Sequence, residues 1–542
     1  MTVTEAIKRK ASELAHGTVS DSEISERICQ FVREEVPYAL EEWNVGADET
    51  LHLRQGMCAG KAQLAVTLHR ATGIKAQFKV LRIVPEEGLL EFIARRLEET
   101  TNSEGSPEQN EKSIRAIRSL PSQRDHIVTQ VSLGGQWRDV DVARDPGLDA
   151  GMRFMGLWQE RRVVSEEGPF DSLNPWIERR MERISVAEDR RRFFDVINEQ
   201  IEQIRKIGNI VIGAGIRPWT YAEVAGAVRD WDIPCGCPFV PGSEDMALDE
   251  IAQKSKEVLT TLTEPTMTNR QEQLLDWLYA LVRHNIKRGR VWELSDVLSQ
   301  RRADCLGYAR ILTVLAAHFG IDAGVVEVVQ DNRGSYVPHY VCLVNLSGKK
   351  RRLIDPWYGS ANICHRLLTA RVKEGASWAT RQVSMETLQA HPSVSGLSRE
   401  QVCGISLYIL GNSHLSQAND DALRCYNSSL WLFPYNSRTL FNRAIVLERL
   451  GEPNKAHADY QQAMSSDPSI ARVLATTEDI EQLIDLDEKG VCEPKQSVYL
   501  MRKGFVTGEE EAWERIAQTL GYTVSQVQEN YRSTERVLAQ ES

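Results

Sequence analysis

The stretch RQGMCAGKAQLAVTLHRATGI, residues 54–74, is echoed later in the chain by RRADCLGYARILTVLAAHFGI, residues 301–321. Each copy places a cysteine, Cys58 or Cys305, at the start of an apolar stretch that ends 15 residues later at Gly-Ile. Small residues follow each cysteine at helical spacing, which favours a buried helix with the cysteine in its first turn. The two stretches therefore predict the same core helix in two parts of one chain.

A strand-like run follows each cysteine helix and carries a histidine and an acid. The first run is DHIVTQVSLGGQWRDVD, and the second is PHYVCLVNLSGKKRRLIDPW. In both, the acid comes 15 or 16 residues after the histidine, which places it on the adjacent antiparallel strand near the level of the histidine. These residues are His126 and Asp141 in the first copy and His339 and Asp355 in the second.

This order of residue types suits thiol chemistry. A free cysteine titrates near ~8.5, and a helix N-terminus or a neighbouring imidazolium lowers that value. An acid beside the histidine fixes the orientation of its ring and favours its charged form. The cysteine N–H would be one donor to an oxyanion, and the candidates for a second donor are Tyr38, Trp43 and Trp292.

Both segments resemble the transglutaminase-like fold of papain-type cysteine enzymes. The resemblance implies that Cys58, His126 and Asp141 form one catalytic triad, and that Cys305, His339 and Asp355 form another. The second copy carries the Asp-Pro ending that is common in that family, at Asp355-Pro356.

The acid of the first copy is less clearly marked. Trp137 matches the aromatic residue that the family usually has four positions before the acid, but Val142 follows Asp141 where proline would be expected. An Asp-Pro pair occurs only at Asp145. Asp139 and Asp145 therefore remain alternatives to Asp141.

The implied activity is cysteine-dependent acyl transfer on amide or thioester bonds of a peptide, protein or acyl-thioester substrate, with no metal or organic cofactor. Two alternatives stay open. One is a peptide-binding scaffold in which one or both catalytic domains are inactive. The other is an amide-forming enzyme of a biosynthetic pathway.

Composition narrows the class of protein. Of 542 residues, 42% are hydrophobic and 26% are charged, which is typical of globular proteins. A net charge of -11 argues against a nucleic-acid partner, and no apolar run suits a membrane helix. The ten scattered cysteines indicate reduced, mostly buried thiols and a cytoplasmic location. Cys235 and Cys237 are expected in a proline-flanked loop rather than in a metal site.

The predicted fold class is α+β, with two transglutaminase-like domains and an all-α helical-repeat C-terminal region. The predicted segments are 1–165 for the first domain, with a charged insert at 86–121 that forms an exposed tip between two helices; 166–265 for a helical connection; 266–395 for the second domain; 400–470 for helical repeats; and 471–542 for a helical tail.

The helical repeats are predicted from a period of 34 residues. Ala422, Tyr426 and Pro434 recur as Ala456, Tyr460 and Pro468, a pattern that resembles tetratricopeptide repeats. Two such repeats cannot bury a solenoid core alone, so they should pack on the second domain and could bind a protein partner. In the tail, acidic residues favour a plain helical hairpin over a DNA-binding helix-turn-helix.

Overall fold

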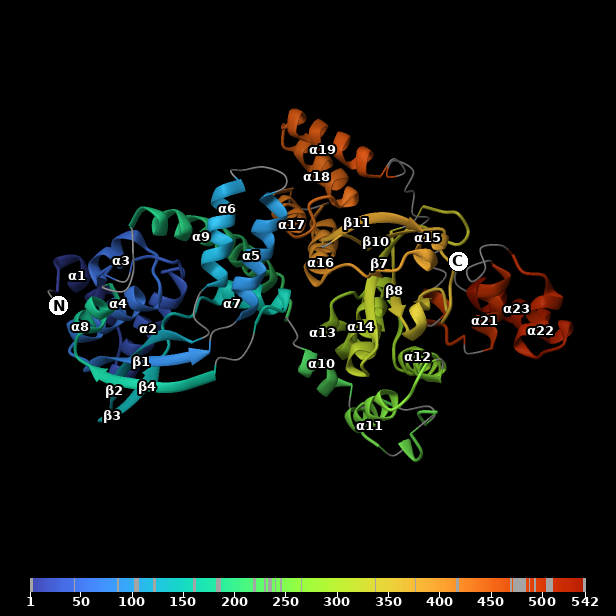
Figure 1. Cartoon of the computed structure of the whole chain (residues 1–542), viewed down its shortest axis with the longest axis horizontal. Helices are drawn as coiled ribbons and strands as arrows, with labels where there is room; N and C mark the ends of the chain where they lie inside the picture. Colours follow the sequence, from blue (N-terminus) through green and yellow to red (C-terminus); the bar gives the residue numbers. More distant parts are fainter. Residues whose placement is uncertain are drawn as a thin grey trace. The chain divides into compact units, whose positions relative to one another are not determined.

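The structure is a computed structural model, which divides into two compact units, Met1–Pro218 and Trp219–Ser542. Figure 1 shows both units, and each is described by itself. The description covers the chain apart from residues 1–2, 43, 85–86, 102–106, 120–122, 159–161, 182–186, 218–220, 229–230, 233–235, 239, 244–245, 265, 337, 376, 416–418, 468–469, 471–483, 487, 492–493, 504–509 and 540–542.

The first unit is built around one buried helix and one antiparallel sheet. Helix α4 begins at Cys58, and every side chain from Cys58 to His69 is buried. Helices α1, α2 and α3 and the sheet, in the order β3-β2-β1-β4, surround it. The bounds are α1 Glu5–Ala15, α2 Asp21–Glu34, α3 Ala47–Leu53, α4 Cys58–Ala71, β1 Ala76–Val84, β2 Arg124–Leu133, β3 Gln136–Val140 and β4 Arg162–Phe170.

The hairpin that carries the first histidine and acid is confirmed. Strands β2 and β3 pair antiparallel from Thr129–Val140 to Leu133–Gln136. Gly134 and Gly135 form the turn with φ values of 58° and 81°, a backbone region that glycine enters without strain. The acid at the end of β3 is thereby brought back beside β2.

The charged insert between β1 and β2 was predicted as an exposed tip between two helices, and residues 102–106 of that tip lie outside the described residues. The insert forms two helices, α5 (Glu87–Thr101) and α6 (Pro107–Arg118), which lie side by side in Figure 1. Apolar residues at helical spacing give each helix a buried face. These buried residues are Phe92, Ile93, Ala94 and Leu97 on α5, and Ile114 and Ile117 on α6.

Three further helices complete the first unit: α7 (Pro146–Met155), α8 (Asn174–Met181) and α9 (Ala187–Gly213). Helices α7 and α9 cross closely, because a Cβ at Gly208 would lie 1.7 Å from the carbonyl oxygen of Gly147. Helices α8 and α9 and the second half of β4 lie beyond residue 165, so the first compact unit includes part of the stretch that was predicted as a connection.

The second unit repeats the same arrangement. Helix α14 begins at Cys305 and packs on a sheet with the order β11-β10-β7-β8-β9, in which β12 also pairs with β10. The bounds are α10 Tyr221–Ala227, α11 Leu248–Thr260, α12 Thr266–Asn285, β5 Lys287–Arg288, α13 Leu294–Gln300, β6 Arg302–Ala303, α14 Cys305–His318, β7 Asp322–Gln330, β8 His339–Asn345, η2 Ser347–Lys349, β9 Arg351–Ile354, β10 Leu367–Glu374, β11 Ser377–Ser384, α15 Met385–Ala390 and β12 Val394–Ser395.

The repeat extends to local backbone detail. Helices α4 and α14 both have 14 residues, and the order β3-β2-β1-β4 corresponds to β9-β8-β7-β10. Helices α3 and α13 both end in an arginine with left-handed backbone, Arg54 with φ 50° and Arg301 with φ 55°. Each arginine lies four residues before its cysteine. A left-handed arginine is uncommon, and it occurs at the same place relative to the cysteine in both units.

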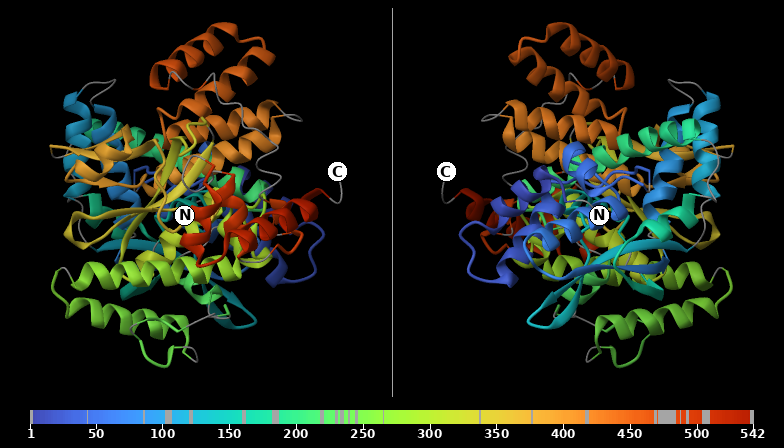
Figure 2. Two further views of the ribbon diagram at one scale, coloured as in Figure 1. Left: turned by 90° about the vertical axis from the view of Figure 1, so that its right-hand side faces the viewer. Right: turned by 90° about the vertical axis from the view of Figure 1, so that its left-hand side faces the viewer.

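Four helices follow the second sheet as antiparallel pairs, drawn in orange in Figures 1 and 2. They are α16 (Arg399–His414), α17 (Asn419–Leu432), α18 (Ser437–Arg449) and α19 (Pro453–Ser466). Ala422, Tyr426 and Ala456 are fully buried between helices, whereas Pro468 lies outside the described residues.

The helical pairs pack on the second sheet and on α14, as the sequence suggested. Ile405 of α16 and Phe433 share an apolar cluster with Leu306 of α14. Arg438 of α18 donates to Glu327 of β7 at 2.6 Å, and both side chains are buried. Polar and apolar contacts thus join the helical pairs to the core of this unit.

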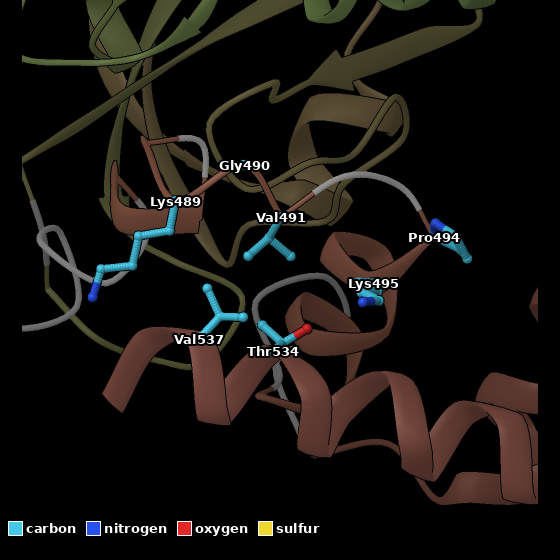
Figure 3. A pocket seen from close by; sticks show the side chains of 7 residues that line it. All are labelled: Lys489, Gly490, Val491, Pro494, Lys495, Thr534 and Val537. Carbon is cyan, nitrogen blue, oxygen red and sulfur yellow. The ribbon is translucent and has the colours of Figure 1, made fainter. Parts of the chain in front are cut away.

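The tail contains α21 (Lys495–Arg502), α22 (Trp513–Leu520) and α23 (Val524–Ala539). Gly521, with φ 71°, ends α22, so α22 and α23 form a helical hairpin. A pocket is lined by Lys489, Gly490, Val491, Pro494, Lys495, Thr534 and Val537, and Figure 3 shows Val491, Thr534 and Val537 turned into it. None of the residues that line it belongs to a predicted triad. Among the described residues, no helix is both long enough and apolar enough to span a membrane.

Candidate active sites

The first cysteine, histidine and acid come together at the start of α4. Cys58 is the first residue of that helix, and His126 lies on β2, which packs against it. His126 Nε2 lies 3.1 Å from Asp141 Oδ2, and the Cys58 side chain shares a hydrogen bond with His126. Because the carboxylate occupies Nε2, Nδ1 is the ring nitrogen left for the sulfur.

Among the three candidate acids of the first copy, only Asp141 contacts the histidine. Asp139 instead accepts hydrogen bonds from Lys79 and Gln130 at 2.7 Å each. Asp145 caps α7 through Leu148 N–H and accepts from Arg205 Nε at 2.8 Å.

Electrostatics in the first site favour a charged imidazole. Burial alone would lower the pKa of His126, but its hydrogen bonds to Asp141 and Cys58 raise it to about 9. Asp141 is itself held by Ala143 N–H, which donates to Oδ1 at 3.0 Å. At neutral pH, His126 is thus a cation next to the sulfur of Cys58 at the start of α4.

Two further ionisable groups surround the start of α4. Glu41 accepts from Met57 N–H at 3.1 Å, and burial raises its pKa to about 8. Lys61 is fully buried on the next turn and donates to the Arg144 carbonyl at 3.3 Å. Burial lowers the pKa of Lys61 to about 8, although nearby Asp145 and Asp141 favour its charge.

The second site repeats this geometry with shorter contacts. His339 opens β8, Asp355 follows β9, and His339 Nε2 lies 2.7 Å from Asp355 Oδ2. Cys305 shares a hydrogen bond with His339. Burial opposes the charge of His339, but Asp355 and Cys305 raise the pKa of His339 to about 10. His339 and its hydrogen bonds in turn hold the pKa of the buried Asp355 well below its usual range.

Three residues that the sequence did not single out surround the second triad. His365 Nε2 lies 3.2 Å from Asp355 Oδ2. The Tyr358 ring stacks on His339 with centroids 4.7 Å apart, and Tyr358 N–H donates to Asp355 Oδ1 at 3.0 Å. Asp304 caps α14 next to Cys305, and burial raises its pKa to about 7. No spacing or periodicity in the sequence connects these three residues with the triad.

His339, Asp355 and His365 are also the described residues that could hold a metal ion, since their ligand atoms lie within 4.8 Å of one another. A metal-bound histidine nearly always donates its other N–H to an acceptor. His365 Nδ1 is buried and has no hydrogen-bond partner in the described part of the chain. Hydrogen bonds to the carboxylate therefore account for this cluster better than a metal does.

The candidates for a second oxyanion donor are placed differently. Tyr38 forms a parallel bridge with Gly56, two residues before Cys58, and its N–H donates to Asp145. Trp292 packs in the same apolar cluster as Cys305. Trp43 lies outside the described residues.

Most of the other described cysteines are buried, as expected. Burial raises the pKa of Cys342, Cys403 and Cys425 to about 12. Cys29 and Cys237 are also buried, whereas Cys235 and Cys492 lie outside the described residues. Cys364 is the exception, because its side chain is exposed on the loop before β10.

Comparison with known proteins bears on the first unit. Residues 8–142 match the family model described as the transglutaminase-like superfamily. The matched segment begins within α1 and ends one residue after Asp141, so it contains the first cysteine, histidine and acid. No curated protein and no solved structure matched the chain. The first unit therefore carries a transglutaminase-like domain, a superfamily associated with cysteine-type acyl transfer or hydrolysis.

Proposed function

We propose that the chain is a cysteine-dependent acyl-transfer enzyme with two reaction sites, one at Cys58 and one at Cys305. A single observation carries the proposal. In each unit, a histidine on a hairpin contacts a carboxylate through Nε2. The same imidazole ring is hydrogen-bonded to a cysteine at the start of a helix. The family match over the first site supports it independently.

The proposed reaction begins with attack of the thiolate on the carbonyl carbon of an amide or thioester. The carbonyl electrons move onto oxygen, which accepts from the cysteine N–H at the helix N-terminus. When the tetrahedral intermediate collapses, the bond to nitrogen or sulfur breaks, and the imidazolium gives its proton to the leaving group. The cysteine then carries the acyl group as a thioester.

A second nucleophile completes the turnover. Water releases a carboxylic acid, and an amine gives a new amide. In each case the neutral histidine removes a proton from the attacking molecule, and the thiolate leaves. Asp141 or Asp355 keeps the ring oriented through both halves of the reaction.

The second site belongs to this proposal although it lies outside the matched residues 8–142. Its helix, strands and left-handed arginine follow the same order as those of the first unit. Cys305 is partly exposed, while His339 and Asp355 are almost fully buried. A reachable sulfur with a buried partner pair is the arrangement that a covalent mechanism needs.

Alkylation by iodoacetamide at pH 6, followed by mass spectrometry of every cysteine, tests the proposal. Activated thiolates at Cys58 and Cys305 should react faster than the exposed Cys364. Labelling of Cys364 ahead of both would contradict the proposal and favour a peptide-binding scaffold. Single Cys58→Ser and Cys305→Ser variants, assayed on pooled peptides and acyl thioesters, then assign turnover to each site.

A further inference from the structure

The loop between β9 and β10 closes around the acid of the second site. Asp355 and Ser360 exchange main-chain hydrogen bonds of 2.7 and 2.8 Å, which fold residues 356–359 into a tight turn. Tyr358 at the apex of this turn donates its N–H to Asp355 Oδ1. The same loop continues to His365, whose Nε2 reaches Asp355 Oδ2 from another direction. Both oxygens of this carboxylate are thus held by the loop.

We infer that His365 is a positioning residue for the second site, holding Asp355 in the orientation that pairs it with His339. The inference rests on the proposed function. His365 is fully buried, and its ring is nearly perpendicular to that of His339, with centroids 5.6 Å apart. Its Nε2–H donates to the same oxygen that His339 uses. The relay at this site therefore has four groups.

The other contacts of His365 agree with a neutral, donating ring. Tyr358 stacks on His339 from one side, and its hydroxyl donates to buried Asp331 at 3.3 Å. His365 meets the edge of the Tyr358 ring at 5.8 Å between centroids. Burial lowers the pKa of His365, although its bond to Asp355 acts in the opposite direction. A neutral histidine with Nε2–H has one hydrogen to give, and the carboxylate receives it.

The first site has no histidine at the matching position. Ten residues after Asp141 stands Gly151, which lies in α7 against Ile204. The side chain of Asp141 is 23% exposed, compared with 1% for Asp355. A carboxylate taken so far out of water is stable only when hydrogen bonds replace its hydration. The additional histidine meets that need at the second site, and the first site is the natural control.

The test compares His365→Phe, which keeps the ring but removes the donor, with His365→Gln, whose amide nitrogen can take the place of Nε2–H. The rate of iodoacetamide labelling of Cys305 at pH 6 is measured in the full chain. The phenylalanine variant should label Cys305 about tenfold more slowly, the scale of one hydrogen bond to a charged group. The glutamine variant should recover most of the wild-type rate.

Other cysteines in the same spectrum serve as controls. Cys58 should label at the wild-type rate in both variants, and buried Cys342 should stay protected if the second unit remains folded. If the phenylalanine variant unfolds, His365→Asn replaces it, because its shorter amide cannot reach Asp355. Slow labelling with asparagine and fast labelling with glutamine would then support the inference.

Two results would overturn it. One is wild-type labelling of Cys305 in a folded variant without the donor. The other is equal slowing by the donor and non-donor variants, which would assign His365 to packing alone. Failure of the proposed function is a separate outcome, since it would appear in the wild-type chain as Cys305 labelling no faster than Cys364.

Discussion

Each proposed catalytic histidine donates through Nε2 to a carboxylate, and this bond decides which ring nitrogen faces the thiol. In both sites the second carboxylate oxygen is held by a main-chain N–H, from Ala143 or Tyr358. The acid is thereby fixed by the backbone that follows its strand. The orientation of the ring thus depends on the hairpin and on the turn after it.

Asp141→Asn should separate the role of this acid from that of its neighbours. The neutral amide no longer stabilises the imidazolium, so the pKa of His126 should fall from about 9 toward its ordinary value. Turnover at Cys58 should drop by about 10²–10⁴-fold. The matched control is Asp139→Asn, which removes a surface acid that contacts Lys79. Equal losses in the two variants would contradict the assignment of Asp141.

As the pH rises, turnover at both sites should begin to decline only above pH 8. A raised histidine pKa means that the imidazolium is fully present below 6.5 and is lost only as the pH passes about 9 for His126 and about 10 for His339. Turnover needs this proton for the leaving group, whereas alkylation of the thiolate does not.

Variants that each lack one of the two proposed catalytic cysteines allow the alkaline decline in activity to be measured at each site. Cys305→Ser reports the first site, and Cys58→Ser reports the second. Turnover should decline above pH 8 while alkylation of the remaining catalytic cysteine continues. A limb centred near pH 6.5 would show that the histidine is not held as a cation.

At the scale of elements, the arginine four residues before each cysteine shows how the chain enters the cysteine helix. Arg54 and Arg301 take a left-handed backbone at the ends of α3 and α13. A residue with a Cβ is strained there, and glycine is not. Because both arginines have this conformation, the chain turns in the same way before α4 and before α14.

Replacing Arg54 by glycine and by alanine isolates this strain. Both changes remove the arginine side chain, but only glycine relieves the left-handed strain. The glycine variant should be more stable than the alanine variant by about 1 kcal/mol in chemical denaturation. At Arg70, which is helical within α4, the order should reverse by a similar amount. The same order at both positions would contradict the argument.

The sequence predicted the elements that its periodicity describes. The cysteine helices and the adjacent antiparallel strands that carry His126 and Asp141 are where they were expected, because apolar spacing specifies them locally. His365 could not be predicted in this way, since a lone histidine in an irregular loop has no pattern.

The limits of the units were also hidden from the sequence. Helix α9 has an ordinary amphipathic pattern, and nothing in that pattern names its partner. Its packing on α7 depends on small residues at one crossing, Gly147, Gly151 and Gly208. Such a contact is specified by shape between distant segments, which local periodicity does not record.

At the scale of the whole molecule, residues 1–218 and 219–542 should each fold as separate fragments, because each unit has its own apolar core. A fragment of residues 219–395 should be markedly less stable than 219–542. It lacks Ile405 and Phe433, which cover Leu306 of α14. Thermal unfolding of the three fragments tests this, and equal midpoints for the two versions of the second unit would contradict it.

Helix α14, which begins at Cys305, also packs against the helical pairs. Arg310, on the second turn of α14, binds Glu293 and reaches Ser406 of α16. A ligand that displaces α16 would therefore be expected to move α14, the helix whose first residue is Cys305. We therefore expect an acyl group on Cys305 to change the affinity of the helical pairs for such a ligand, and the ligand to change the stability of the acyl form by the same free energy.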